Sequence, residues 1–159
     1  MTEEQRRFRR VMGSFPTGVT VVTSRGPDAS PCGMTANSVA SVSLDPLLVL
    51  VCLDRAASSH GCIIEGGAFA ISVLSHEDED LARRFAKGRW RERFKGIDLR
   101  EEVTGSPILA RSLAWVDCRV KEVHEGGDHS IVVGEVVACD AREGEPLVFF
   151  RGGYHRMKV

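Results

Sequence analysis

Seven consecutive apolar residues, Leu47 to Leu53, form the longest apolar run of the chain. A helix needs about 20 such residues to cross a bilayer, so this run predicts a strand that is buried on both of its faces. Further β-branched or apolar segments predict strands at Thr17–Ser24, Ala68–Leu74, Ser112–Val123, His129–Cys139, Leu147–Phe150 and Tyr154–Met157. The chain must therefore fold around a sheet.

Helices and irregular segments interrupt these strands. A periodic apolar face, made of Phe8, Val11, Met12 and Phe15, predicts an amphipathic helix over residues 2–14. Serine caps predict two more helices, from Ser58 or Ser59 to Gly66 and from Ser75 to Lys87. The segment 31–43 is less regular, and the charged segment 88–107 predicts a mobile excursion. The spacing does not fit alternating βαβ units, so we expect one mainly β domain over residues 1–159, an antiparallel barrel or sandwich with inserted helices.

Charge and cysteine content narrow the class of protein. The net charge of -1 and the pI near 6.5 give no basic surface for nucleic acid or an anionic membrane. The five cysteines are widely spaced and include no Cys-x-x-Cys pair, so we expect neither a disulfide framework nor a zinc knuckle, and a reducing compartment. The charged N-terminus lacks the apolar stretch of a signal peptide. We therefore expect a cytoplasmic protein.

The segment Gly33–Ser43 is rich in small and polar residues. Small side chains let a flat ligand lie close to the backbone, whose N–H groups then meet ring carbonyls and nitrogens. Short hydrogen-bonding side chains are supplied by Thr35, Asn37, Ser38, Ser41 and Ser43. A polar strand with a bulge explains the same composition.

The segment Cys52–His60 leaves the apolar strand and opens a helix with two hydroxyls, Ser58 and Ser59, near Arg55. Free N–H groups at a helix N-terminus attract phosphate. An ordinary serine cap is the alternative. Cys52 is interpreted as a small core residue rather than a nucleophile.

Gly127-Asp128-His129 stands at the tip of the long hairpin. With Gly126-Gly127 as the turn, His124 and His129 would face each other across the strands and could bind a metal. A solvated hairpin tip, or an imidazole placed over a ring in a cleft, fits the spacing equally well.

A basic cluster surrounds Phe85-Ala86-Lys87-Gly88, and it consists of Arg83, Arg84, Arg89, Arg91 and Arg93. These residues could clamp phosphates, but such a charged segment is usually a solvated face.

Tyr154-His155-Arg156 could line a cleft or close the last strand. The sequence contains no G-x-G-x-x-G that follows a strand, no G-x-S-x-G and no H-E-x-x-H.

Taken together, the motifs resemble the flavin reductase-like family, the reductase components of two-component flavin monooxygenases. The likeness runs from Phe8 to Met157 and is carried by FRRVMGSFPTGVTVVT, GMTANSVASVSLDPLLVLVCLDRAASSHGCI, FAISVLS, FAKG, TGSPILARSLAWVDCRV, GDHSIVVGEV and YHRM. Val39 departs from the pattern, since many relatives carry an aromatic there. The segment 89–103 also matches poorly.

The resemblance implies a split β-barrel of the flavin reductase or FMN-binding type, a homodimer with its flavin near the subunit interface, and it assigns no residue to a metal. Residues implied to line the flavin ring and ribityl chain are Thr35, Ala36, Asn37 and Ser38, with backbone contacts from Ser41, Val42, Ser43, Cys52, Leu53 and Asp54. Those implied to hold the phosphate are Ser58, Ser59 and His60, with Phe85 and Ala86 approaching from the next helix. Those implied to hold the nicotinamide nucleotide are Asp128, His129, Tyr154 and Arg156, with His129 as the catalytic residue.

The implied activity is reduction of FMN or FAD by NADH or NADPH, through hydride transfer from nicotinamide C4 to flavin N5, with reduced flavin passed to a separate monooxygenase. Such a reaction needs two stacked rings and stabilised charge rather than a catalytic triad. Three alternatives remain at this point: a non-catalytic flavin- or haem-binding split barrel, an enzyme of the pyridoxamine phosphate oxidase type, and a metal-binding barrel.

Overall fold

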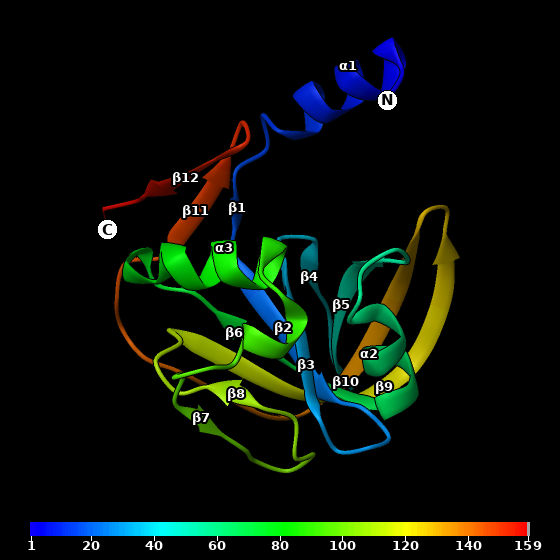
Figure 1. Ribbon diagram of the computed structural model, residues 1–159, viewed down its shortest axis with the longest axis vertical. Helices are drawn as coiled ribbons and strands as arrows, with labels where there is room; N and C mark the ends of the chain where they lie inside the picture. The colour runs from blue at the N-terminus through cyan, green and yellow to red at the C-terminus, as the bar shows by residue number, and fades with distance from the viewer. Residues whose placement is uncertain (159) are drawn as a thin grey trace.

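Antiparallel strands are the main element of the chain, and three short α-helices accompany them, one before the first strand and two between later strands (Figure 1). The structure is a computed structural model that describes residues 1–158, without the side chain of Arg91. The helices are α1 (Glu3–Met12), α2 (His60–Gly66) and α3 (Glu79–Lys87), with 3₁₀ turns η1 (His76–Asp78) and η2 (Trp90–Glu92). The strands are β1 (Thr17–Gly18), β2 (Thr20–Arg25), β3 (Pro31–Ala36), β4 (Val39–Leu44), β5 (Leu47–Asp54), β6 (Ala68–Val73), β7 (Leu99–Arg100), β8 (Ile108–Leu109), β9 (Ala114–Gly126), β10 (His129–Ala141), β11 (Leu147–Phe150) and β12 (Gly153–Arg156).

The main sheet has the strand order β3-β2-β6-β9-β10-β5-β4. Seven flat strands about 4.8 Å apart would place the outer two about 29 Å from each other. However, the outer strands β3 and β4 are consecutive and are joined only by Asn37 and Ser38. A two-residue link spans at most about 11 Å between the strand ends. The sheet must therefore curl until its two edges meet.

The curled sheet is nearly a barrel, but β3 and β4 do not pair with each other. At the seam, Ser38 bonds twice to Cys52 of β5: its hydroxyl donates to the Cys52 carbonyl (2.9 Å), and its own carbonyl accepts from the Cys52 amide (3.1 Å). One core cluster fills the interior with side chains from the curled strands and α2, among them Val22, Leu53 and Phe69. These findings agree with the mainly β, split-barrel expectation.

A second core cluster joins α3 to the small sheet β1-β11-β12. Phe85 of α3 is fully buried and meets Phe94 edge-on, with ring centroids 5.0 Å apart. Helix α1 is different, because none of its residues is buried and it projects from the body of the molecule (Figure 1). Among the described residues, no helix has both the length and the apolar character that a membrane span requires.

Two expectations about strands need correction. The segment 31–43, expected to be irregular, forms β3 and β4; its small residues serve packing, since a Cβ on Gly33 would lie 2.9 Å from the Val22 carbonyl oxygen. The apolar strand Leu47–Leu53 is not buried on both faces. Val51 and Leu53 point into the core, whereas Leu48, Leu50 and Cys52 on the opposite face are only half-buried, and Leu50 and Cys52 line an open groove.

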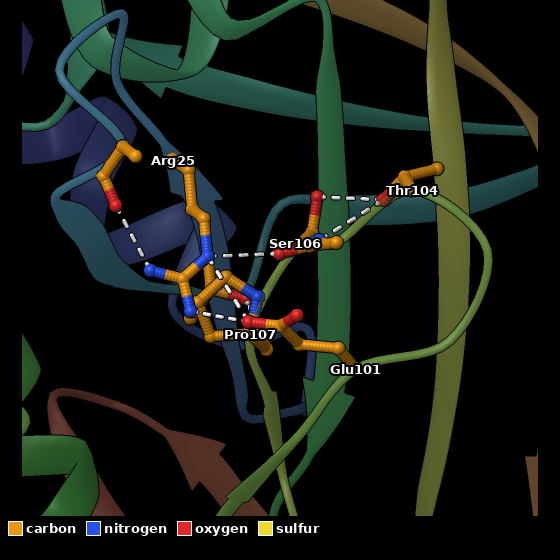
Figure 2. Close-up of polar contacts among 8 residues, drawn as sticks. Arg25, Glu101, Thr104, Ser106 and Pro107 are labelled. Atoms are coloured by element: carbon orange, nitrogen blue, oxygen red, sulfur yellow. Dashed lines mark hydrogen bonds and ion pairs between the residues drawn. The ribbon is translucent and has the colours of Figure 1, made fainter.

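The segment 88–107 is anchored rather than a free excursion (Figure 2). The Arg25 guanidinium pairs with Glu101 and donates from Nε to the Gly105 carbonyl at 3.0 Å. The buried Asp117 carboxylate accepts from the amides of Val103 and Thr104, both at 2.8 Å. The predicted mobility came from the density of charge in this segment, but much of that charge has partners that lie far away in the sequence.

A disulfide joins Cys32 of β3 to Cys62 of α2, so the expectation of unpaired cysteines is wrong. The two residues are 30 positions apart. They meet because α2 packs against β2 and β3, a contact that no spacing motif announces. Three cysteines remain free: Cys52, Cys118 and Cys139.

We predict that the denatured, unreduced protein titrates three thiols and the reduced protein five. Replacing Cys62 with serine should lower the free energy of unfolding by about 3 kcal/mol, because the crosslink restricts the unfolded chain. Urea unfolding measures this. A reducing agent should weaken the wild type equally and leave the variant unchanged; five thiols without reductant would contradict the disulfide.

Candidate functional site

An open groove of about 1290 Å³ runs along the seam of the curled sheet. Its lining comes from α1 and the following turn (Phe8, Arg9, Arg10, Met12, Gly13, Ser14, Phe15, Pro16), from β1 and β2 (Thr17, Gly18, Thr20), from the seam, β4 and β5 (Asn37, Ser38, Val39, Ala40, Leu50, Cys52), and from Val73, Phe149, Arg151 and Gly152. The walls are mostly apolar. Polar side chains come from the seam (Asn37, Ser38), from Thr17 and Thr20, and from the segment around α1 and Arg151. A groove of this kind suits a flat ligand that carries a few hydrogen-bonding groups at its edge.

Three of the predicted cofactor residues line this groove: Asn37, Ser38 and Cys52. The Asn37 amide nitrogen donates to the Thr17 hydroxyl at 3.1 Å, which fixes the side chain and leaves Oδ1 as an acceptor for a ligand. Ser38 is held by its two bonds to Cys52. The seam therefore presents a fixed backbone and one oriented amide.

The neighbouring predicted residues have structural partners. The Thr35 hydroxyl donates to the Ala82 carbonyl at 2.6 Å, and the buried Ala36 accepts at its carbonyl from Thr20 at 2.7 Å. Ser41, Val42 and Ser43 lie farther along the edge strand β4, outside the groove lining. The side chain of Leu53 points into the core, so any ligand contact of that residue involves its backbone.

The predicted phosphate segment lies at the start of α2, and none of its three residues is among the groove-lining residues given above. Ser58 is exposed, but Ser59 is buried and its hydroxyl donates inward to the Gly33 carbonyl at 2.8 Å. His60 Nε2 is 2.9 Å from the Ser130 hydroxyl. The Asp54 carboxylate accepts from the Ala56 amide at 2.8 Å and so closes the turn that leads into this segment.

The basic cluster is not a uniform solvated face. Arg93 is only 9% exposed, and burial lowers the pKa of its guanidinium from the ordinary value. Phe85 is buried in the core and Ala86 is exposed, so of these two only Ala86 offers its side chain to a ligand. The Arg91 side chain lies outside the described part of the chain. Nothing in the sequence pattern separated Arg93 from its exposed neighbours.

The hairpin turn is Gly127-Asp128, so the predicted register is wrong. His129 pairs with Gly126, and His124 pairs with Ile131, so the two histidines do not face each other. Within the described residues, no cluster of three or more His, Cys, Asp or Glu is arranged as metal ligands.

The strand register places His129 near the groove. His129 pairs with Asp54, two residues beyond Cys52 on the same face of β5. Its Nδ1 is 2.7 Å from the Asp128 carboxylate, and this hydrogen bond and the histidine charge lower the pKa of Asp128.

Tyr154 and Arg156 lie across the groove from His129, since β12 and the β9–β10 turn stand on opposite sides of the molecule (Figure 1). The Tyr154 ring meets Phe149, a groove residue, at 5.4 Å, and Arg83 lies 5.0 Å from its centroid. Burial raises the pKa of its hydroxyl. Arg156 pairs with Glu145. One chain therefore does not bring Tyr154 and Arg156 next to His129.

Sequence reasoning missed the wall of the groove that comes from α1, β1 and β11. Thr17, Thr20 and Phe149 line the groove with the apolar face of α1. The available signal was the unpartnered apolar stripe of that helix, next to a Pro-Thr-Gly turn.

Comparisons with known proteins identify the class to which this fold and groove belong. The model of the flavin reductase like domain matches residues 12–158. The chain therefore belongs to the flavin reductase-like family. The resemblance seen in the sequence motifs is confirmed.

Individual relatives are similar over nearly the whole chain. The reductase subunit HsaB of a flavin-dependent monooxygenase from Rhodococcus jostii is 43% identical and covers 95% of this chain and 77% of its own length. The NADH-dependent FMN reductase SmoA of Agrobacterium fabrum is 44% identical, with coverages of 97% and 87%. An NADH:FAD oxidoreductase of Streptomyces globisporus, solved with NAD and FAD fragments, superposes with a TM-score of 0.91 at 40% identity and coverages of 98% and 94%.

The residues of this groove fit a flavin. Val39, Leu50 and Phe149 supply apolar surface for a ring system, while Asn37 and the backbone at the seam supply hydrogen-bonding groups at its edge. The volume also exceeds that of many small-molecule sites, which hold about 300–1,000 Å³.

We predict that Thr17→Val weakens flavin binding about fivefold, because Asn37 loses the hydrogen bond that orients its amide. Quenching of flavin fluorescence measures the dissociation constant. In an Asn37→Ala background the same substitution should have no further effect. Additive losses in the double variant would show that Thr17 acts independently of Asn37.

Proposed function

We propose that this chain reduces FMN or FAD at the expense of NADH and supplies the reduced flavin to a separate flavin-dependent monooxygenase. The observation that carries the proposal is the mostly apolar groove along the seam, where a fixed backbone and the oriented Asn37 amide supply hydrogen-bonding groups. The relatives support the same activity, since HsaB is a reductase subunit of a monooxygenase and SmoA is an NADH-dependent FMN reductase.

When bound, the flavin supplies the hydride acceptor and the nicotinamide supplies the donor. The chain holds the two rings in contact and excludes water with the apolar walls of the groove. Asn37 and the seam backbone bind the polar edge of the flavin, and Ser58 and His60 lie where its phosphate is expected. His129, held by Asp128, contacts the nicotinamide nucleotide from the open end of β5.

The alternatives have less support. A pyridoxamine phosphate oxidase or a non-catalytic flavin or haem carrier would also use a split barrel, but the relatives named above are reductases. The metal-binding alternative depended on His124 facing His129, and the observed register separates them.

The working unit in this proposal is a homodimer. Phe8, Val11 and Met12 of the projecting helix, and Phe15 just after it, are 51–67% exposed, and an amphipathic helix needs a partner for its apolar face. The outer face of β5, formed by Leu48, Leu50 and Cys52, is also only half-buried. A second copy would cover both surfaces. It would also provide a Tyr154 and an Arg156 beside the groove that carries His129.

We place this activity in the cytoplasm, where NADH is available. The five-cysteine composition was the basis for expecting a reducing compartment, and the Cys32–Cys62 bond makes thiol content of the protein isolated from cells a direct test of that location. Protein alkylated during cell lysis should show five thiols if the compartment is reducing, with the disulfide forming on later exposure to air; a bond already present at lysis would favour an oxidising compartment.

Purified protein should oxidise NADH rapidly only when FMN or FAD is added, and His129→Ala should raise KM for NADH about tenfold while changing KM for flavin little. Loss of NADH absorbance measures both. His124→Ala is the matched control, because the exposed His124 ring forms its hydrogen bond with the exposed Glu122, and the variant should behave as wild type. Equal losses for both substrates would overturn the role given to His129, and tight FMN without NADH use would favour an oxidase.

Sedimentation analysis tests the dimer. Phe8→Asp with Val11→Asp should give a monomer, because two carboxylates would be buried in the interface, and should raise KM for flavin about tenfold as the groove loses a wall. Arg6→Asp, on the polar face of the same helix, should remain dimeric. A monomeric wild type with full activity would contradict this assembly.

A further inference from the structure

Arg93 is a buried cation that ties three segments together. Its Nη1 donates to the Gly33 carbonyl of β3 at 2.7 Å and to the Ser59 hydroxyl at 3.2 Å. Its Nε donates to the carbonyl of Gly88, just after α3, at 3.0 Å. The guanidinium therefore joins β3, the start of α2 and the end of α3.

No carboxylate pairs with this guanidinium in the part of the chain that the structure describes. The other buried charged side chains are satisfied differently: Asp78 pairs with Arg111 and Ser75, and Asp117 accepts three hydrogen bonds. Burying a cation without a counter-ion is costly, and carbonyl dipoles offset only part of that cost. The structure thus holds an uncompensated positive charge beneath residues 58–60.

Ser59 connects this charge to the surface. Its hydroxyl donates to the Gly33 carbonyl at 2.8 Å and accepts from Arg93, so both of its roles are used inside the protein. The backbone of residues 58–60 is consequently held against β3, the strand that leads into the Asn37–Ser38 seam. His60 is fixed on its other side by Ser130 at 2.9 Å.

We propose that Arg93 is a positioning residue for the phosphate of the flavin. It holds residues 58–60 in the geometry that receives the phosphate, and its buried charge is balanced when the phosphate is present. This inference rests on the proposed function, because it takes the ligand to be a flavin nucleotide. It explains why a cation is placed here with dipoles and no acidic side chain.

Riboflavin, which is FMN without its phosphate, separates this role from a merely structural one. We expect Arg93→Met to lower the ratio of kcat/KM for FMN to kcat/KM for riboflavin at least about tenfold, mainly through KM for FMN, with riboflavin reduction nearly unchanged. Arg84→Met is the matched control. Arg84 also donates to a carbonyl, that of Lys95, from a half-buried position on α3, and its loss should leave the ratio unchanged.

Arg93→Lys should retain most of the FMN preference, because it keeps the charge. Inorganic phosphate should compete with FMN, and it should raise KM for FMN less in Arg93→Met than in wild type. If the methionine variant does not fold, Arg93→Gln, which keeps a donor without charge, takes its place. Equal losses for FMN and riboflavin, or an unchanged ratio, would overturn the proposal and leave flavin reduction intact. Failure of wild type to reduce any flavin would instead overturn the proposed function.

Discussion

The two-residue link between β3 and β4 is the constraint on which the rest of this structure depends. It connects the first and last strands of a seven-stranded sheet, so the sheet curls and its interior becomes the core. Because the two edges meet without pairing, the backbone groups around Asn37 and Ser38 do not all form hydrogen bonds between β3 and β4. The same link that forces the curl thereby leaves a strip of fixed main chain facing a groove.

The chemistry that this groove serves asks little of individual side chains. Hydride transfer between two bound rings depends on their contact and on the charge that develops on the reduced ring. The groove accordingly has mostly apolar walls and one oriented amide, and the segment proposed to receive the phosphate is anchored by the Ser59 hydroxyl. Other residues fix the positions of the groups in this site. Thr17 holds the Asn37 amide and Cys52 holds Ser38. Arg93 and the Cys32–Cys62 bond hold the start of α2.

The exposed apolar surfaces of the single chain, on α1 and on β5, lie in the same elements that line the groove. Helix α1 contributes one wall of the groove and yet buries none of its own residues. The outer face of the apolar strand β5 is likewise only partly covered. A groove with such walls is open on the side where a second copy would dock. Assembly and ligand binding are therefore coupled in this account, because both depend on α1.

The sequence by itself determined the strands β2, β5, β6, β9 and β10, the approximate places of the three helices, the mainly β class and, through its motifs, the flavin reductase-like family, because these depend on local periodicity and on short residue patterns. It also pointed to Asn37, Ser38 and Cys52. It did not determine the caps, since the Ser59 side chain makes no cap bond and Ser75 caps the turn η1 rather than α3. Only the tertiary structure decided the hairpin register, the pairing of Cys32 with Cys62, the burial of Arg93 and the exposure of β5. Each of these depends on residues that are distant in sequence. A local pattern does not reveal whether a given charged or apolar side chain will be buried, because burial depends on which other segments pack over it.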